Sequence, residues 1–303
     1  MIDFVGKRQW FFRISGILIV AGIISLAVFG IKPGPDFAGG TSMMLQFSPA
    51  VEQSQLREEM AKLGYDKATI QYAGEGNFII HLREITSAEA RELAGKLGTE
   101  LDSQVEITDY YLVSGTVAAK TARNAVIAVI VAAVAMMLYI VWAFRRMPSP
   151  FRWGICAIIA LIHDVFIIVG IFSLLGWLVG VEIDALFITG LLAVVGYSIN
   201  NTVVVFDRIR ENVSRHIRPD FAETVNDSLI ETLGRCLNTA LTTFFVLLAL
   251  FLFGGATIHY FVLVLLLGVI IGTYSSICIS SQLLVVWERR EWGALLPFAK
   301  RTA

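Results

Sequence analysis

This 303-residue chain contains few charged residues, and this scarcity narrows the class of protein at once. Lys, Arg, Asp and Glu together make up 16% of the chain, against about 25% in an ordinary soluble domain. Hydrophobic residues make up 56%, and the mean hydropathy is +0.71. The composition excludes a soluble enzyme, so we expect an integral membrane protein that is not an enzyme.

Cysteine, histidine and net charge are also low, and each excludes a kind of site or partner. The three cysteines, Cys156, Cys236 and Cys278, lie in or beside apolar segments, so no disulfide framework is expected in the long polar region. The formal net charge of −1 argues against nucleic acid as a partner. The polar region offers no nucleophile, metal-ligand cluster or phosphate loop, and we interpret its lone His81 as structural. We therefore expect no cofactor and no metal.

Six apolar segments are each long enough to cross the roughly 30 Å hydrocarbon core of a bilayer. They are residues 14–31, 124–144, 152–177, 183–206, 236–254 and 258–286. The first exceeds the apolar part of a signal peptide and no A-x-A cleavage site follows it, so we interpret it as an anchor. The sequence thus predicts a polytopic α-helical membrane protein with six transmembrane helices.

Lys and Arg are unevenly distributed between the connections, which sets the expected orientation. With the amino terminus inside, they gather at the start, after the second span, between the fourth and fifth spans, and in the tail. The short outer connections near 178–182 and 255–257 contain none. We therefore expect a multi-pass protein of the bacterial cytoplasmic (inner) membrane with both termini in the cytoplasm. The expected divisions are 1–31 (amino terminus and first helix), 32–123 (extracytoplasmic domain), 124–287 (helices two to six, with a cytoplasmic loop at 207–235) and 288–303 (cytoplasmic tail).

The polar region between the first two spans has the pattern of a small α+β domain. Alternating and helical periodicities, with glycine at the turns, predict strands and helices in the order β-α-β-β-α-β. The predicted elements are strands 41–47, 67–73, 77–83 and 105–111 and helices 51–63 and 86–97. This order is that of a ferredoxin-like split βαβ unit.

Short motifs of polar and small residues recur in order along nearly the whole chain. They are GPDFAGGT at 34–41, ALIHDV at 160–165, GYSINNTVVVFDRIREN at 196–212, GRCLNTALTT at 234–243, LFGG at 252–255 and IGTYSS at 271–276. Together they resemble the SecF family of the SecD–SecF protein-export complex. Six spans with one large domain after the first are also similar to half of a resistance–nodulation–division transporter.

The resemblance implies an accessory subunit of the Sec protein translocase that promotes export driven by the proton-motive force. The implied partners are a SecD-like subunit, the SecY/SecE/SecG channel, exported polypeptide chains and the lipid bilayer. Two alternatives stay open: an ion-uncoupled assembly subunit of the same complex, and a small-molecule or lipid exporter of the resistance–nodulation–division superfamily. The exporter would need a larger outer domain with a substrate cleft.

The family usually has an acidic residue at the position of Asn201, in the pattern Asn-Asp-Thr, whereas an amide cannot titrate. Three explanations stay open. The complex relies on an acid in SecD alone, a neighbouring acid substitutes, or the chain is a coupling-deficient paralogue or an altered form. Asn201 lies about 7–8 Å inside the predicted cytoplasmic end of its span.

The other candidates for an ion relay are Arg235, Asp164, Asp207 and Asn238. Asp164 lies near mid-bilayer, where an acid is either functional or a structural hydrogen-bonding group. The resemblance links Arg235 to proton transport, and the alternative is a snorkelling arginine. Asp207 either pairs with a nearby arginine or ends the helix. Arg235 and Asn238 share a helical stripe, which we expect to converge with Asn201 between the fourth and fifth spans.

Two further patterns concern packing. Gly268, Gly272, Ser276 and Ser280 recur every four residues and predict a close helix–helix contact. Phe221, Val225 and Leu229 predict an amphipathic helix at the cytoplasmic interface before the fifth span.

Overall fold

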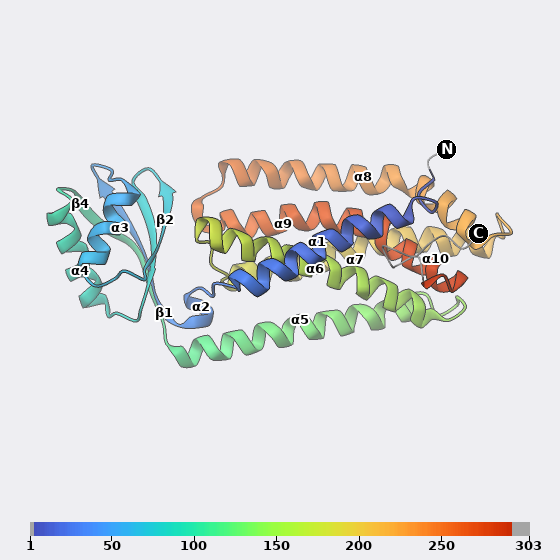
Figure 1. Ribbon diagram of the computed structural model, residues 1–303, viewed down its shortest axis with the longest axis horizontal. Helices are drawn as coiled ribbons and strands as arrows, with labels where there is room; N and C mark the ends of the chain where they lie inside the picture. Colours follow the sequence, from blue (N-terminus) through green and yellow to red (C-terminus); the bar gives the residue numbers. More distant parts are fainter. Residues whose placement is uncertain (1–2, 293–303) are drawn as a thin grey trace.

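A computed structural model describes residues 3–292 as a long helical bundle with a small domain at one end (Figure 1). The predicted cytoplasmic tail at 288–303 falls largely outside the described residues. Described residues 3–7 lie at the bundle end opposite the small domain, as does the end of the last helix (Figure 1).

Six helices are long and apolar enough to cross a membrane, as the sequence predicted. They are α1 (Arg8–Phe29), α5 (Gly115–Ala143), α6 (Pro150–Val179), α7 (Ala185–Ser214), α8 (Phe221–Phe253) and a last helix over Ala256–Arg289. The last helix consists of α9 (Ala256–Ser275), a π-helical turn η1 (Ser276–Ser280) and α10 (Ser281–Arg289). Several run past the predicted spans, because a helix satisfies its own backbone hydrogen bonds beyond the apolar stretch.

The six helices differ in how much of each is covered by the rest of the chain. In α6, α7 and the last helix, 56%, 50% and 72% of the most apolar window is buried. The corresponding shares for α1, α5 and α8 are 17%, 6% and 11%. Helices α6, α7 and the last helix therefore form the centre of the bundle. Helices α1, α5 and α8 have large faces left for lipid or another protein.

The stripe of small residues lies in the contact between α9 and α7, so the predicted close packing is confirmed. A Cβ atom added to Gly268 would lie 2.0 Å from Val194 Cγ2, and one added to Gly272 would lie 3.0 Å from Ser198 Cβ. Ser276 and Ser280 continue the stripe and are fully buried. The absence of side-chain atoms at these two glycines lets α7 and α9 approach closely.

The small domain has the predicted order of elements, with bounds that differ by a few residues. Its strands are β1 (Gly40–Ser48), β2 (Thr69–Gly74), β3 (Asn77–Leu82) and β4 (Gln104–Val113), and its helices are α3 (Gln53–Lys62) and α4 (Ser87–Glu100). A short helix, α2 (Pro35–Ala38), precedes β1. The sheet order is β2-β3-β1-β4, with antiparallel pairing throughout. Helix α4 passes Gly98, which was expected to end it.

The helices α3 and α4 cover one face of this sheet, and the opposite face is turned toward the bundle (Figure 1). Strand β3 shows how the sequence separates the faces. Phe78, Ile80 and Leu82 alternate into the core under the helices, so His81 must point to the open face.

The prediction of a separate amphipathic helix at the cytoplasmic interface is wrong. Helix α8 runs without a break from Phe221 to Phe253. Val225 and Leu229 are fully buried in the main core of the bundle, which also contains Phe206 and Leu284. An apolar face with a 3.6-residue period can be buried against other helices or in a lipid interface. Here the other helices of the bundle bury this face of α8.

Candidate functional site

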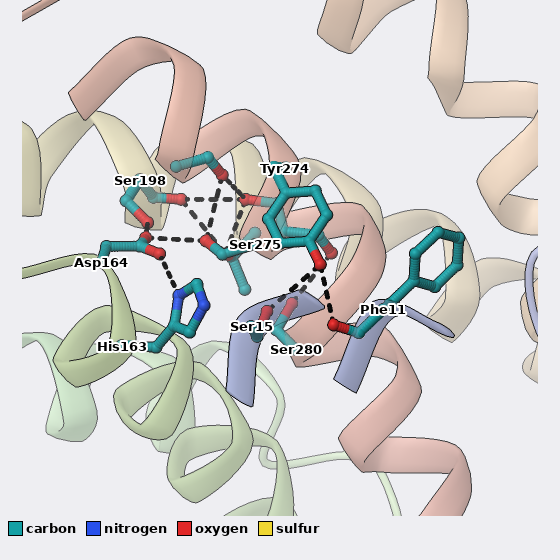
Figure 2. A network of polar contacts seen from close by, with 11 residues as sticks. Phe11, Ser15, His163, Asp164, Ser198, Tyr274, Ser275 and Ser280 are labelled. Carbon is teal, nitrogen blue, oxygen red and sulfur yellow. Dashed lines mark hydrogen bonds and ion pairs between the residues drawn. The ribbon is translucent and has the colours of Figure 1, made fainter. Parts of the chain in front are cut away.

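A buried carboxyl group lies at the centre of the bundle. Asp164 stands midway along the 30-residue α6, and its side chain is 1% exposed. Its Oδ2 accepts hydrogen bonds from Ser198 Oγ on α7 at 2.6 Å and from Ser275 Oγ on α9 at 2.7 Å (Figure 2). Each hydroxyl replaces a hydrogen bond that water would give, which offsets part of the cost of burial. The three central helices thus meet at one acid.

His163 lies beside this carboxyl group on the same helix. Its Nδ1 is 2.9 Å from Asp164 Oδ1, and the ring is almost completely buried. The other ring nitrogen, Nε2, is buried and has no hydrogen-bond partner within residues 3–292. An acid in contact with a base that keeps one nitrogen free is an arrangement that can pass a proton between side chains.

Two more polar contacts join α7 and the last helix beside Asp164. Asn201 Nδ2 donates to Thr273 Oγ1 at 3.2 Å, and Thr202 Oγ1 lies 3.1 Å from Ser276 Oγ. Asn201 is 2% exposed, so its amide faces protein and not lipid. Since Asn201 follows Ser198 by three residues on α7, its side chain shares a helix face with one of the serines that bind the carboxyl group of Asp164.

Tyr274 extends the polar contacts to α1. Its Oη donates to the carbonyl oxygen of Phe11 at 2.9 Å and lies 3.1 Å from Ser15 Oγ (Figure 2). Its ring centre is 6.3 Å from that of His163. Tyr274 therefore hydrogen-bonds the first helix and places its ring beside that of His163, which contacts the carboxyl group of Asp164.

The last helix changes its winding directly after Ser275. Residues Ser276–Ser280 form the π-helical turn η1, in which Ser276 Oγ donates to the carbonyl oxygen of Gly272 at 2.7 Å. Single π-helical turns inside α-helices occur frequently at functional sites. This turn adjoins the serine that binds Asp164, so a local change in winding would move that hydroxyl.

The predicted convergence of Arg235 and Asn238 with Asn201 is wrong. Arg235 and Asn238 lie on an exposed face of α8, together with Thr239 and Thr242. Arg235 makes no hydrogen bond or ion pair with any residue in the described part of the chain. Periodicity correctly placed these residues on one face of the helix, but that face is turned away from the buried network.

Asp207 behaves as one of the sequence interpretations expected, and Asp184 has a structural role at a helix start. Asp207 is exposed and pairs with Arg210, with 2.5 Å between Oδ1 and the guanidinium. Asp184 caps α7, because its Oδ1 accepts from the backbone nitrogen of Phe187 at 2.7 Å. Asp207 therefore lies apart from the buried network around Asp164.

The contribution of the last helix to the buried network was not predicted from the sequence. Ser275 and Tyr274 supply two of the donors described above and Thr273 supplies an acceptor, yet the sequence showed them only as members of the motif IGTYSS at 271–276. Serine and threonine are common in membrane helices, and no spacing relates Ser275 to an acid more than a hundred residues earlier. Within residues 3–292, no cluster of three or more His, Cys, Asp or Glu side chains is arranged to hold a metal.

Comparison with known proteins places this architecture in a family. Residues 94–290 match the family described as protein export membrane protein SecD/SecF, C-terminal. A protein translocase subunit SecF from Thermobaculum terrenum is 42% identical over 304 residues, which cover 96% of each chain. The protein translocase subunit SecDF of Bacillus subtilis is 35% identical over 95% of this chain and 38% of its own length.

Solved structures agree with the sequence relatives. The crystal structure of SecDF from Thermus thermophilus matches with a TM-score of 0.84 and 34% identity, over 95% of this chain and 39% of that one. The fold and the matching residues define a multi-pass membrane protein of the protein-export class. The chain belongs to the SecF family of protein translocase subunits. It spans nearly the full length of its SecF relative and less than half of the SecDF chains.

Proposed function

We propose that this subunit couples proton movement through its helical bundle to protein export, with Asp164 as the group that gains and loses the proton. The observation that carries the proposal is the Asp164 carboxyl group, buried at mid-helix and bound by serines from two neighbouring helices. An ionisable group inside a membrane bundle is rare and costly, and such groups mark ion pathways. Of the three explanations for Asn201, the proposal adopts substitution by a neighbouring acid.

Protonation of Asp164 changes what its neighbours can do. The charged carboxylate accepts from Ser198 and Ser275, whereas the neutral acid carries a hydroxyl that must itself donate. One of the present bonds then weakens or changes partner, and the balance of contacts among α6, α7 and α9 shifts. Such a two-state contact inside a packed bundle is the kind of element that converts proton binding into helix movement.

The topology that follows from the charge distribution is part of this proposal. The termini and the loop 207–235 lie in the cytoplasm, and residues 32–123 form an extracytoplasmic ferredoxin-like domain. The sheet order β2-β3-β1-β4 and the antiparallel pairs support the ferredoxin-like assignment, because a split βαβ unit inserts β3 between two parallel strands. Movement of this domain then acts on exported chains that leave the SecY/SecE/SecG channel.

The exposed polar stripe on α8 supports a SecD-like partner. Asn238, Thr239 and Thr242 lie within the predicted fifth span, and Arg235 lies at its cytoplasmic edge, on a helix that the rest of the chain leaves largely uncovered. Facing acyl chains with these groups would be costly, so a second helical unit must cover them. In the SecDF relatives, a single longer chain contains the region that matches this one. We therefore expect the chain to co-purify with a SecD-like subunit from native membranes and expect its loss to slow protein export. Purification of an unaccompanied chain would contradict the assignment.

Replacement of Arg235 with alanine is expected to lower proton-gradient-dependent export, because the partner would lose the guanidinium that faces it. Export into membrane vesicles, measured with and without a proton gradient at equal expression, provides the test. Arg145→Ala removes an exposed arginine from the same end of the bundle and is the matched control. If Arg235→Ala exports as well as the parent, Arg235 has no part in coupling.

Replacement of Asn201 with aspartate is expected to leave proton-driven export unchanged or to raise it. The substitution restores the acid that the family usually has, next to the Thr273 hydroxyl, which now accepts from the Asn201 amide and donates to the carbonyl oxygen of Val269. The same vesicle assay measures the effect. Export below the parent level would show that the amide at this position is itself required.

The ion-uncoupled assembly subunit is the second candidate, and the amide at Asn201 favours it. The two candidates differ in one measurable property. A coupling subunit loses gradient-dependent export when Asp164 can no longer titrate, whereas an assembly subunit does not.

A further inference from the structure

We propose that His81 and Glu182 form a proton-dependent contact that holds the outer domain against the bundle, so that the position of this domain responds to the pH at that surface. The inference rests on the proposed function for its orientation, which places residues 32–123 outside. It adds a second site of proton action, separate from Asp164, and assigns a role to a histidine that the sequence analysis interpreted as structural.

The pair joins two parts of the chain that are far apart in sequence. His81 projects from β3 on the open face of the sheet, and Glu182 lies in the short connection between α6 and α7. His81 Nδ1 and Glu182 Oε2 are 2.5 Å apart. Their side chains are only 16% and 11% exposed, so solvent screens the interaction less than it screens a surface pair. This is the one ion pair between the outer domain and the bundle within the described residues.

The two chain connections to the outer domain pass through one place, and we infer that the domain pivots there. Gly39 precedes β1 and Gly115 follows β4, and a Cβ atom added to Gly39 would lie 3.2 Å from the Gly115 Cα. Gly39 has φ of 78°, a conformation that glycine adopts without strain. Because β3 lies on the other side of β1 from β4, the His81 contact is offset from this pivot. A contact beside a pivot fixes the angle of the domain.

Other charged and titratable groups surround the pair. Asp66, Lys67, Tyr65 and Arg83 from the outer domain line the same cavity of about 280 Å³ as His81 and Glu182. Asp36 and Asp184 approach from the bundle side, where Asp36 Oδ2 accepts from the backbone nitrogen of Ala185 at 2.9 Å. Burial raises the pKa of Asp184 above its ordinary value, and the neighbouring Asp36 carboxylate acts in the same direction. Histidine is the side chain that proteins use as a charge switch between about pH 5 and 8, so the imidazole is the group of this cluster that the proposal invokes.

The sign of the effect follows from the charges. A protonated imidazole forms an ion pair with a carboxylate as well as a hydrogen bond, whereas a neutral imidazole forms the hydrogen bond without the ion pair. The contact therefore contributes most to docking below the range in which histidine titrates, and part of that contribution is lost as the pH rises through it. A proton-motive force that acidifies the outer side would favour the docked domain.

The position of Glu182 relates this contact to the buried acid. The connection that carries Glu182 joins α6, which contains Asp164, to α7, which contains Ser198. Ile183 in the same connection donates its N–H to Lys32 O and accepts from Gly34 N, both at 2.8 Å. A shift of α6 against α7 at Asp164 would therefore move both Glu182 and the segment that leads through Gly39 into the outer domain.

The test is a distance measurement on the full chain in lipid nanodiscs. Spin labels are attached after Lys96→Cys on α4 and Thr257→Cys on α9, with the buried native cysteines Cys156, Cys236 and Cys278 replaced by alanine. Pulsed electron–electron double resonance measures the distances between the two labels, and the share of short distances gives the docked fraction. It is recorded at about pH 5.5 and about pH 8, which bracket the range in which histidine ordinarily titrates. We expect the docked-to-undocked ratio to fall about tenfold from the lower to the higher pH. This is the difference between a hydrogen bond made by a charged imidazole and one made by a neutral imidazole.

Conservative variants decide whether the pair causes the response. His81→Gln and Glu182→Gln should each remove the pH dependence, and the double variant should be no worse than either one. Glu106→Gln neutralises an exposed acid on β4 away from the His81–Glu182 contact. The docked fraction of this variant should depend on pH as that of the parent does. A parent ratio that does not change with pH, or a response that survives Glu182→Gln, overturns the proposal. The measurement needs no export activity, so its failure would leave the proposed function of Asp164 standing.

Discussion

Replacement of Asp164 with asparagine is expected to abolish the proton-gradient-dependent part of export while leaving the chain folded. Asparagine has nearly the same shape, and its carbonyl oxygen can accept from both Ser198 and Ser275. Its amide group can donate to His163 Nδ1. The hydrogen bonds survive, but the group that takes up a proton is gone. Export of the variant should therefore fall to the level that the parent shows when the gradient is collapsed.

Replacement of Asp164 with alanine separates loss of the acid from loss of its contacts. Two buried serine hydroxyls would lose their acceptor, and a buried polar group left unpaired costs about 1–3 kcal/mol. We expect Asp164→Ala to lower the free energy of unfolding by about 2–4 kcal/mol, whereas Asp164→Asn changes it little. Unfolding of the purified variants in detergent, followed by circular dichroism, distinguishes the two.

Asp207→Asn is the matched control for these variants, because Asp207 is an acid on the next helix that is exposed and paired with Arg210. It should export like the parent. Gradient-dependent export by Asp164→Asn at parent levels would rule out Asp164 as the titrating group. The ion-uncoupled assembly subunit would then be the better description of the chain.

The sequence was sufficient to predict the six spans and the order of elements in the small domain. Both follow from local rules that the packing does not override. A span is recognised by its apolar length, and a strand by alternation between turns such as Gly74–Gly76, where positive φ requires glycine or a tolerant residue. The predicted helix at 221–229 shows where such rules stop, since periodicity identifies an apolar face without identifying what covers it.

The candidate site was only half predictable for the same reason. Asp164 could be selected because any acid inside a span is unusual. Its partners could not, because Ser275 carries no signal that distinguishes it from a serine that bonds its own backbone. The face of α8 that carries Arg235 was identified correctly and assigned to the wrong neighbour, since the rotation of a helix depends on the whole bundle. His81 was interpreted as structural from its neighbours in the sequence. Its partner Glu182 lies 101 residues away, so the contact could not be predicted from those neighbours.

Replacement of Gly268 with alanine is expected to destabilise the bundle more than any other single methyl added to this stripe. The new Cβ would lie 2.0 Å from Val194 Cγ2, and Val194 is a buried, β-branched residue that cannot move aside easily. Forced overpacking of this kind costs about 1–3 kcal/mol, and the better helix propensity of alanine offsets up to about 1 kcal/mol. Because α7 also carries Ser198, separation of α7 from α9 should weaken gradient-dependent export as well.

Two further variants show whether the clash itself is responsible. Gly16→Ala adds the same methyl group to α1, where nothing lies within 4 Å of the new Cβ. The free energy of unfolding of this variant should therefore equal that of the parent or be slightly higher. Val194→Ala removes the opposing methyl groups, and Gly268→Ala combined with Val194→Ala should recover most of the stability lost by Gly268→Ala alone. Additive losses in the double variant would show that the two side chains do not meet. In that case the close approach of α7 and α9, on which the geometry around Asp164 depends, would be wrong.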